Sequence, residues 1–165
     1  MYTEGTVNTI IAGVVAGTVA TIVLDCWAII AKHWFRLPTM NWAMAGRWIG
    51  HMPAGVFTHR AIAEAAPVPG ERALGWTLHY AIGVAYGVIY YIYLSATGSE
   101  ANLLSALVLA WLFLAAPWLI MQPGLGVGIF SRNAPKPWFA RGNSVLAHTF
   151  FGLGLYLGAV LVAAL

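Results

Sequence analysis

Most apolar residues of this chain fall into four runs, each long enough to cross the hydrocarbon core of a membrane. The runs cover residues 7–31, 73–94, 103–121 and 144–165, and roughly 20 residues of helix span the core. Only 8 % of the 165 residues are charged and 61 % are hydrophobic, which leaves too little polar surface for a water-soluble fold. The sequence therefore predicts an all-α integral membrane bundle of four transmembrane helices in a single domain, 1–165.

The basic residues define the expected orientation of that bundle. All eight Lys and Arg residues lie in two segments, 32–72 and 132–141, while the turn at 95–102 has none. By the positive-inside rule both basic loops are cytoplasmic, and the N- and C-termini lie on the outer, periplasmic side. Residues 1–8 carry Glu4 and no basic residue, unlike a cleaved signal peptide, so we expect the first run to remain as a helix. Because orientation accounts for the basic residues, we expect membrane lipids and no nucleic acid as partners.

The connection between the first two runs, residues 33–71, is too long for a turn and too apolar for a free cytoplasmic segment. We expect it to lie at the membrane interface as short helices. Thr39 is a predicted N-cap for the first of them, and Thr58 for a second that runs to Ala66 and stops before Pro67.

An internal repeat links the second and fourth runs. Arg72 and Arg141 are each followed seven residues later by a histidine, His79 and His148, and four residues further on by a glycine. This spacing predicts two repeated helix pairs related by a pseudo-two-fold axis along the membrane normal.

Depth in the membrane groups the polar residues of the runs. Asp25 lies seven residues inside Lys32, and His79 and His148 lie seven inside their arginines, so each is roughly 10 Å below the cytoplasmic interface. Gln122 belongs near the same layer. A charged side chain at the membrane centre costs about 2.5 to 3.5 kcal/mol even on the mildest scale, so these groups should face one another. We therefore predict one cluster of Asp25, His79, His148 and Gln122.

Such a cluster is compatible with several chemistries. Asp25, His79, His148 and Gln122 offer oxygen and nitrogen ligands to a divalent transition metal, and the two histidines alone suit a haem clamped between facing helices. A proton relay or a structural hydrogen-bond network needs no cofactor. Binding or translocation of a cation, either a proton or a transition metal, is the leading hypothesis. A haem-binding or redox accessory subunit is the alternative.

Small residues form stripes on the predicted helices. Glycines four residues apart occur at 13 and 17, 83 and 87, and 154 and 158, the spacing that packs membrane helices closely. They either pack this chain's own helices or leave room for a ligand or an oligomer contact. Because four helices enclose little lumen, we expect a homo-oligomer or a subunit of a larger membrane complex.

A glycine-rich basic loop follows the third run. Gly126 and Gly128 precede Arg132 and Lys136, and free backbone N–H groups beside basic side chains suit a phosphate or a lipid head group. A lipid head-group enzyme or a purely structural subunit is therefore a further alternative, although no nucleophile with a nearby base stands out.

Three ionisable residues of the first connection are site residues of second rank. His51 and His59 either contribute to a metal site or are solvated interfacial histidines, which is the commoner case. Glu71 either complements the helix dipole at the start of the second run or has a functional role.

Several short motifs extend over almost the whole chain. They are Leu-Asp-Cys-Trp-Ala at 24–28, Asn-Trp-Ala-Met-Ala-Gly-Arg-Trp at 41–48 with Gly-His at 50–51, Gly-Glu at 70–71, Gly-Trp at 75–76 with His-Tyr at 79–80, Met-Gln-Pro at 121–123 with glycines at 126 and 128, and His148 with Phe-Gly-Leu-Gly at 151–154. With them the chain resembles an uncharacterised family of small bacterial inner-membrane proteins. The resemblance implies that location and four helices, and it brings no activity, substrate or catalytic residues.

Overall fold

The computed structural model describes residues 2–164, which consist of helices, turns and loops and contain no β-strand. Within this part of the chain, four helical spans are long and apolar enough to cross a membrane: Asn8–Trp34, Glu71–Thr97, Leu103–Gly124 and Pro137–Ala163. The predicted all-α class with four membrane-spanning helices is confirmed.

Three of the spans are continuous helices: α1 (Tyr2–Trp34), α3 (Glu71–Thr97) and α6 (Pro137–Ala163). The sequence placed the start of the last helix at residue 144, whereas α6 begins seven residues earlier. The reason is Pro137, because proline fits the first turn of a helix, where its missing N–H is not needed.

The third span is interrupted, although a single run over 103–121 was expected. It consists of α4 (Leu103–Leu112), a turn, the π-helix η3 (Pro117–Met121) and the short α5 (Gln122–Gly124). Pro117 cannot donate a backbone hydrogen bond, so the regular ladder ends before it and the chain continues with a wider turn.

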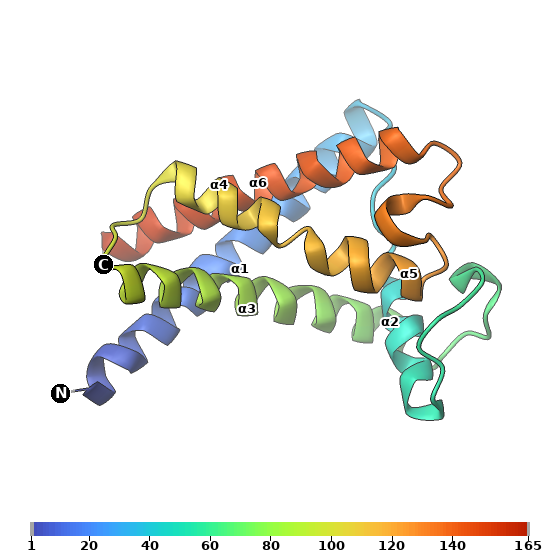
Figure 1. Ribbon diagram of the computed structural model, residues 1–165, viewed down its shortest axis with the longest axis horizontal. Helices are drawn as coiled ribbons and strands as arrows, with labels where there is room; N and C mark the ends of the chain where they lie inside the picture. The colour runs from blue at the N-terminus through green and yellow to red at the C-terminus, as the bar shows by residue number, and fades with distance from the viewer. Residues whose placement is uncertain (1, 165) are drawn as a thin grey trace.

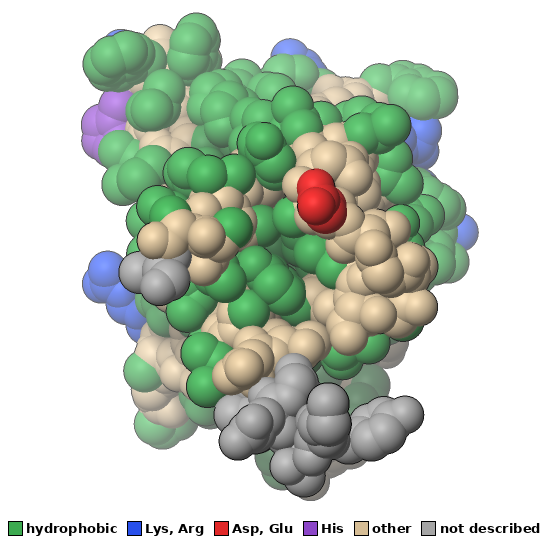
Figure 2. Space-filling view, turned by 90° about the vertical axis from the view of Figure 1, so that its left-hand side faces the viewer, with side chains coloured by type: hydrophobic (Ala, Val, Ile, Leu, Met, Phe, Trp, Pro, Cys, Tyr) green, Lys and Arg blue, Asp and Glu red, His purple; other side chains and the backbone are tan. Residues whose placement is uncertain are grey.

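The two ends of the molecule differ in charge. The termini and the turn between α3 and α4 lie together at the left of Figure 1, and α2 (Trp42–His51) and α5 lie at the opposite end. Figure 2 views the end with the termini, where an acidic side chain stands among hydrophobic and uncharged polar ones and Lys and Arg appear only around the rim. The basic loops thus share the other end, as the alternation of four spans requires.

Glycines let α1 contact both α3 and α6 at close range. A methyl group on Gly17 would meet the backbone of Gly83, and one on Gly87 would meet the backbone of Gly13 and Gly17. Gly154 and Gly158 of α6 pack in the same way against the backbone of α1 at residues 20 and 16. The four-residue glycine spacings therefore pack this chain's own helices, which is the plainer of the two interpretations.

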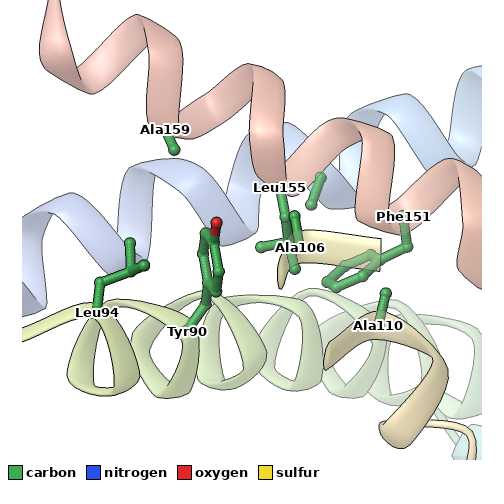
Figure 3. Packing of buried hydrophobic residues seen from close by; sticks show 8 residues of the cluster. Tyr90, Leu94, Ala106, Ala110, Phe151, Leu155 and Ala159 are labelled. Atoms are coloured by element: carbon green, nitrogen blue, oxygen red, sulfur yellow. The ribbon is translucent and has the colours of Figure 1, made fainter. Parts of the chain in front are cut away.

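The larger of two apolar core clusters joins the four spans on the side of the termini. Figure 3 shows its residues converging from α3, α4 and α6, with α1 behind them. Tyr90 is fully buried there, and its hydroxyl lies 3.0 Å from the Ser105 hydroxyl and 3.3 Å from the Asn102 carbonyl oxygen, so the one polar atom is satisfied. The cluster comprises Ala20, Tyr90, Leu94, Ala106, Ala110, Phe151, Leu155 and Ala159.

The α1–α3 connection (residues 35–70) contains α2 and two short 3₁₀ helices, η1 (Met52–Ala54) and η2 (Ile62–Glu64). The cap of α2 is Asn41, whose side chain accepts from the backbone of Ala43, and the prediction of Thr39 was wrong. The predicted helix from 58 to 66 was also wrong.

The reason lies in the backbone partners of that segment. The N–H of His59 donates to Gly124 O at 3.0 Å and that of Ile62 to Leu125 O at 3.1 Å. These bonds to the end of the third span replace the local bonds of a helix.

Candidate functional site

A buried imidazole and a carboxylate meet where α1 contacts α3. His79 Nε2 lies 2.9 Å from Asp25 Oδ1, and the Tyr80 hydroxyl donates to Asp25 Oδ2 at 3.0 Å. The His79 side chain is 6 % exposed and that of Asp25 is 20 % exposed. When Asp25 is ionised, both of its oxygens accept a hydrogen bond, and Nε2 of the imidazole is the donor. We call these two residues the Asp25/His79 pair.

The glycine packing of α1 on α3 sets this distance. His79 lies one turn before Gly83, and Asp25 lies one turn after the fully buried Thr21, so both side chains emerge beside the close backbone contact at Gly17 and Gly83. The Thr21 hydroxyl donates to the Gly17 carbonyl of its own helix at 2.8 Å and does not compete for the carboxylate.

Tryptophan rings enclose the imidazole. The Trp42 ring stacks on His79 with 3.9 Å between ring centroids and 21° between planes, and Trp76 meets the imidazole edge-on at 5.6 Å. Trp42 can approach because α2 and α3 touch through Gly46 and Gly75, where a methyl group would meet backbone atoms. The stacked Trp42 ring therefore excludes water from one face of the imidazole.

His148 and Gln122 have other partners. His148 Nδ1 donates to the Ser144 carbonyl of its own helix at 3.0 Å, and Gln122 Oε1 accepts from the backbone N–H of Ser131 at 2.8 Å and from its hydroxyl at 3.0 Å. The predicted four-residue cluster is therefore reduced to the Asp25/His79 pair and Tyr80.

A metal or haem at this position finds few ligands. Among residues 2–164 no three His, Cys, Asp or Glu side chains lie close enough together to hold a metal ion. A haem clamped by His79 and His148 would need a ring nitrogen of each directed at the iron. His79 Nε2 is hydrogen-bonded to Asp25, and the Trp42 ring covers one face of the imidazole, so the surroundings of His79 do not fit the role of a haem ligand.

A second ionic contact, which the sequence did not predict, anchors the α1–α3 connection. Arg47 Nε and Nη2 each lie 2.8 Å from a Glu71 carboxylate oxygen. Nη1 of the same guanidinium lies 3.0 to 3.4 Å from the carbonyls of Ile62, Ala63 and Ala65. Hydrogen bonding to the carboxylate raises the pKa of the Arg47 guanidinium above its ordinary value. The second-rank residue Glu71 thus holds α2 on α3.

The glycine-rich loop does not form the expected anion cradle. The N–H groups of Gly126 and Gly128 donate to backbone carbonyls of the same segment at N···O distances of 3.1 and 3.3 Å. The expectation of free N–H groups was therefore wrong, and Arg132 and Lys136 remain exposed beside an occupied backbone.

The other second-rank residues lie together. His51, at the end of α2, and His59 are 2.8 Å apart between ring nitrogens. They lie on the α1–α3 connection and are separate from the Asp25/His79 pair.

Comparison with known proteins places the chain in a family. The match covers residues 14–162 and carries the description protein of unknown function, DUF2938. The chain belongs to this family. No curated protein and no solved structure matches the chain. The matched region contains both the Asp25/His79 pair and the two contacting histidines, His51 and His59.

Proposed function

We propose that this multi-pass protein binds and transfers a proton in the bacterial inner membrane, and that the Asp25/His79 pair is the proton-binding group. The observation that carries the proposal is the 2.9 Å contact between a buried imidazole and a carboxylate on two membrane-spanning helices. Charged side chains in a membrane are costly and face inward at sites of ion or proton transfer.

The donor set favours a proton over a transition metal. Two side chains supply one carboxylate and one imidazole, whereas a bound divalent ion typically takes three or four protein ligands. A proton needs only one donor and one acceptor. Histidine changes its charge near neutral pH, and a carboxylate at hydrogen-bond distance accepts or returns the proton without a large movement of either group.

The two residues of the pair differ in their access to solvent. Trp42 and Trp76 enclose His79, while Asp25 remains partly exposed and also accepts from Tyr80. Protons therefore reach the pair through the carboxylate. With the basic loops in the cytoplasm and both termini in the periplasm, the pair lies in the cytoplasmic half. A second copy or a larger membrane complex would complete the path.

Proton flux into proteoliposomes tests this function. A potassium diffusion potential drives protons, and a trapped pH-sensitive dye reports them. We expect flux above that of protein-free liposomes, and its loss in Asp25→Asn and in His79→Gln, which keep side-chain size but not the titrating pair. Glu100→Gln, an exposed acid at the end with the termini, is the matched control and should retain the flux.

Folding of each variant is checked by its thermal transition in detergent. A purely structural pair predicts lower transition temperatures in both variants and flux equal to that of the wild type per folded molecule. That result, or wild-type flux no greater than that of empty liposomes, would overturn the proposal.

A further inference from the structure

His51 and His59 face each other through one ring nitrogen each. His51 Nδ1 lies 2.8 Å from His59 Nε2, a short distance for a hydrogen bond between two nitrogens. Their ring centroids are 5.1 Å apart, which is close to the N···N distance plus one ring radius on each side. The two nitrogens therefore lie almost on the line between the rings, and their lone-pair directions point at one another.

The outer ring nitrogens determine how many protons this contact needs. His51 Nε2 lies 3.0 Å from the Ala66 carbonyl oxygen, and His59 Nδ1 lies 3.1 Å from that of Gly124. A carbonyl oxygen only accepts, so both outer nitrogens must carry hydrogen. A neutral imidazole has one N–H. Two neutral rings would therefore leave both inner nitrogens, His51 Nδ1 and His59 Nε2, without a hydrogen. Bare nitrogens 2.8 Å apart repel, whereas one additional proton makes the contact a charge-assisted hydrogen bond.

We infer that His51 and His59 together bind one proton at their inner nitrogens, carry a single positive charge, and thereby fasten the α1–α3 connection to α5. This site is separate from the Asp25/His79 pair and goes beyond the proposed function. With the basic loops in the cytoplasm, this site lies at the cytoplasmic end of the molecule.

The charged groups around the two histidines are compatible with one positive charge. Glu71 at the start of α3 interacts electrostatically with His51, and Arg47 neutralises that carboxylate from one turn earlier on α2. Arg60 follows the second histidine in the chain, and Glu64 lies in η2. The outer hydrogen bond of His59 goes to Gly124 of α5, and the three residues of α5 include no charged side chain.

Three further bonds depend on the same docking. The backbone N–H groups of His59 and Ile62 donate to α5 and the residue after it, and Trp48 Nε1 donates to the Phe57 carbonyl at 2.8 Å. With no shared proton the two lone pairs repel, and with two protons two cations repel. Docking should therefore be strongest at intermediate pH and weaker on both sides.

Two substitutions of one residue separate the shared proton from simple packing. The amide of His59→Gln places an N–H near the position of Nε2, so it can donate to His51 without an added proton. The shorter His59→Asn places its N–H near the position of Nδ1, so it keeps the bond to Gly124 and loses the contact between the rings. Both are made in the full-length protein in nanodiscs.

Amide hydrogen exchange at Ile62 reports docking. We divide the exchange rate of the wild type by that of His59→Gln and expect this ratio to have a minimum at intermediate pH. The reason is that docking depends on the shared proton only in the wild type. His59→Asn should exchange faster than wild type at that minimum by roughly 10- to 100-fold, the ratio for a hydrogen bond to a charged group. A ratio of wild type to His59→Gln that is flat with pH would overturn the inference.

The proton itself is visible to NMR. In protein labelled with ¹⁵N only at its five histidines, we expect a ¹⁵N–¹⁵N coupling across one hydrogen bond, present in the wild type and absent in His59→Asn. Two facing ring nitrogens could also bind a metal ion in place of the proton, and metal analysis of the same sample distinguishes these two cases. About one copper or zinc per chain that is lost in His59→Asn, with no such coupling, would show that a metal and not a proton occupies the site.

Discussion

The four-helix bundle and the α1–α3 connection are stabilised by different forces. In the bundle, α1 meets α3 and α6 through glycines and backbone, and the core contains a single large polar side chain, Tyr90, whose hydroxyl is satisfied. In the connection, Arg47, Trp48 and His51 each use a polar group to hold a neighbouring segment. Lipid provides no hydrophobic force between helices, so close packing stabilises the bundle. Directional polar contacts stabilise the α1–α3 connection.

The largest effect is expected where a methyl group enters the bundle. Gly87→Ala places a carbon against the backbone of Gly13 and Gly17 and forces α1 and α3 apart, so we expect a loss of about 1 to 3 kcal/mol or failure to fold. Thermal unfolding in detergent measures it. Gly142→Ala on α6, where the added methyl meets nothing within 4 Å, is the control and should leave stability unchanged or slightly raised. Equal transition temperatures in both variants would mean that close fit is not decisive.

Next in size is removal of the Arg47 guanidinium. Arg47→Ala leaves the Glu71 carboxylate and three carbonyls of the connection without their donor, so limited proteolysis between residues 52 and 66 should become severalfold faster. The bundle itself should survive, because its glycine contacts are untouched. Arg132→Ala, at an exposed position, is the control. Loss of the whole fold in Arg47→Ala would mean that the two regions are not stabilised separately.

A smaller effect is expected at the Trp48 indole. Trp48→Phe keeps most of the buried ring and removes the donor to the Phe57 carbonyl, which should cost about 0.5 to 1.5 kcal/mol of local stability. Hydrogen exchange of the backbone around residue 57 measures the change. The exposed Trp34 provides a matched Trp34→Phe control with no expected effect. Unchanged hydrogen exchange around residue 57 in Trp48→Phe would mean that the bond to the Phe57 carbonyl does not stabilise the connection.

The smallest effect concerns the start of α2. Asn41→Ala removes the side-chain oxygen that accepts from Ala43 and should cost about 1 kcal/mol, whereas Thr39→Ala should cost nothing. Helix content of the full chain and exchange at the first turn of α2 measure it. The reverse order of the two variants would restore Thr39 as the cap.

The sequence predicted the depth of polar residues better than their direction. Asp25 and His79 were grouped because they lie at one depth, and they do meet. His148 lies at a similar distance from its arginine, but its imidazole is bonded to its own helix. Depth follows from counting residues, whereas the direction in which a side chain points depends on how each helix is rotated. Gln122 shows this most clearly, because the π-helix after Pro117 changes that rotation and the amide accepts from Ser131.

The contact between Arg47 and Glu71 was missed for a related reason. The two residues are 24 positions apart, and they meet only because Gly46 and Gly75 bring α2 against α3. The sequence showed an apolar interfacial segment with an arginine and an acid at a helix start, which are common features when taken separately. Their pairing is a property of the packed structure.

The central claim is tested most directly by following the protonation of the Asp25/His79 pair. Asp25 is the sole aspartate of the chain, so ¹³C-labelled aspartate gives a single carboxyl signal, and ¹⁵N-labelled histidine provides the partner. The account predicts that the Asp25 carboxyl and His79 ring signals shift together as the pH changes, and that His79→Gln alters the titration of Asp25. A carboxyl signal and a His79 signal that both stay constant across the pH range in which flux is measured would contradict it.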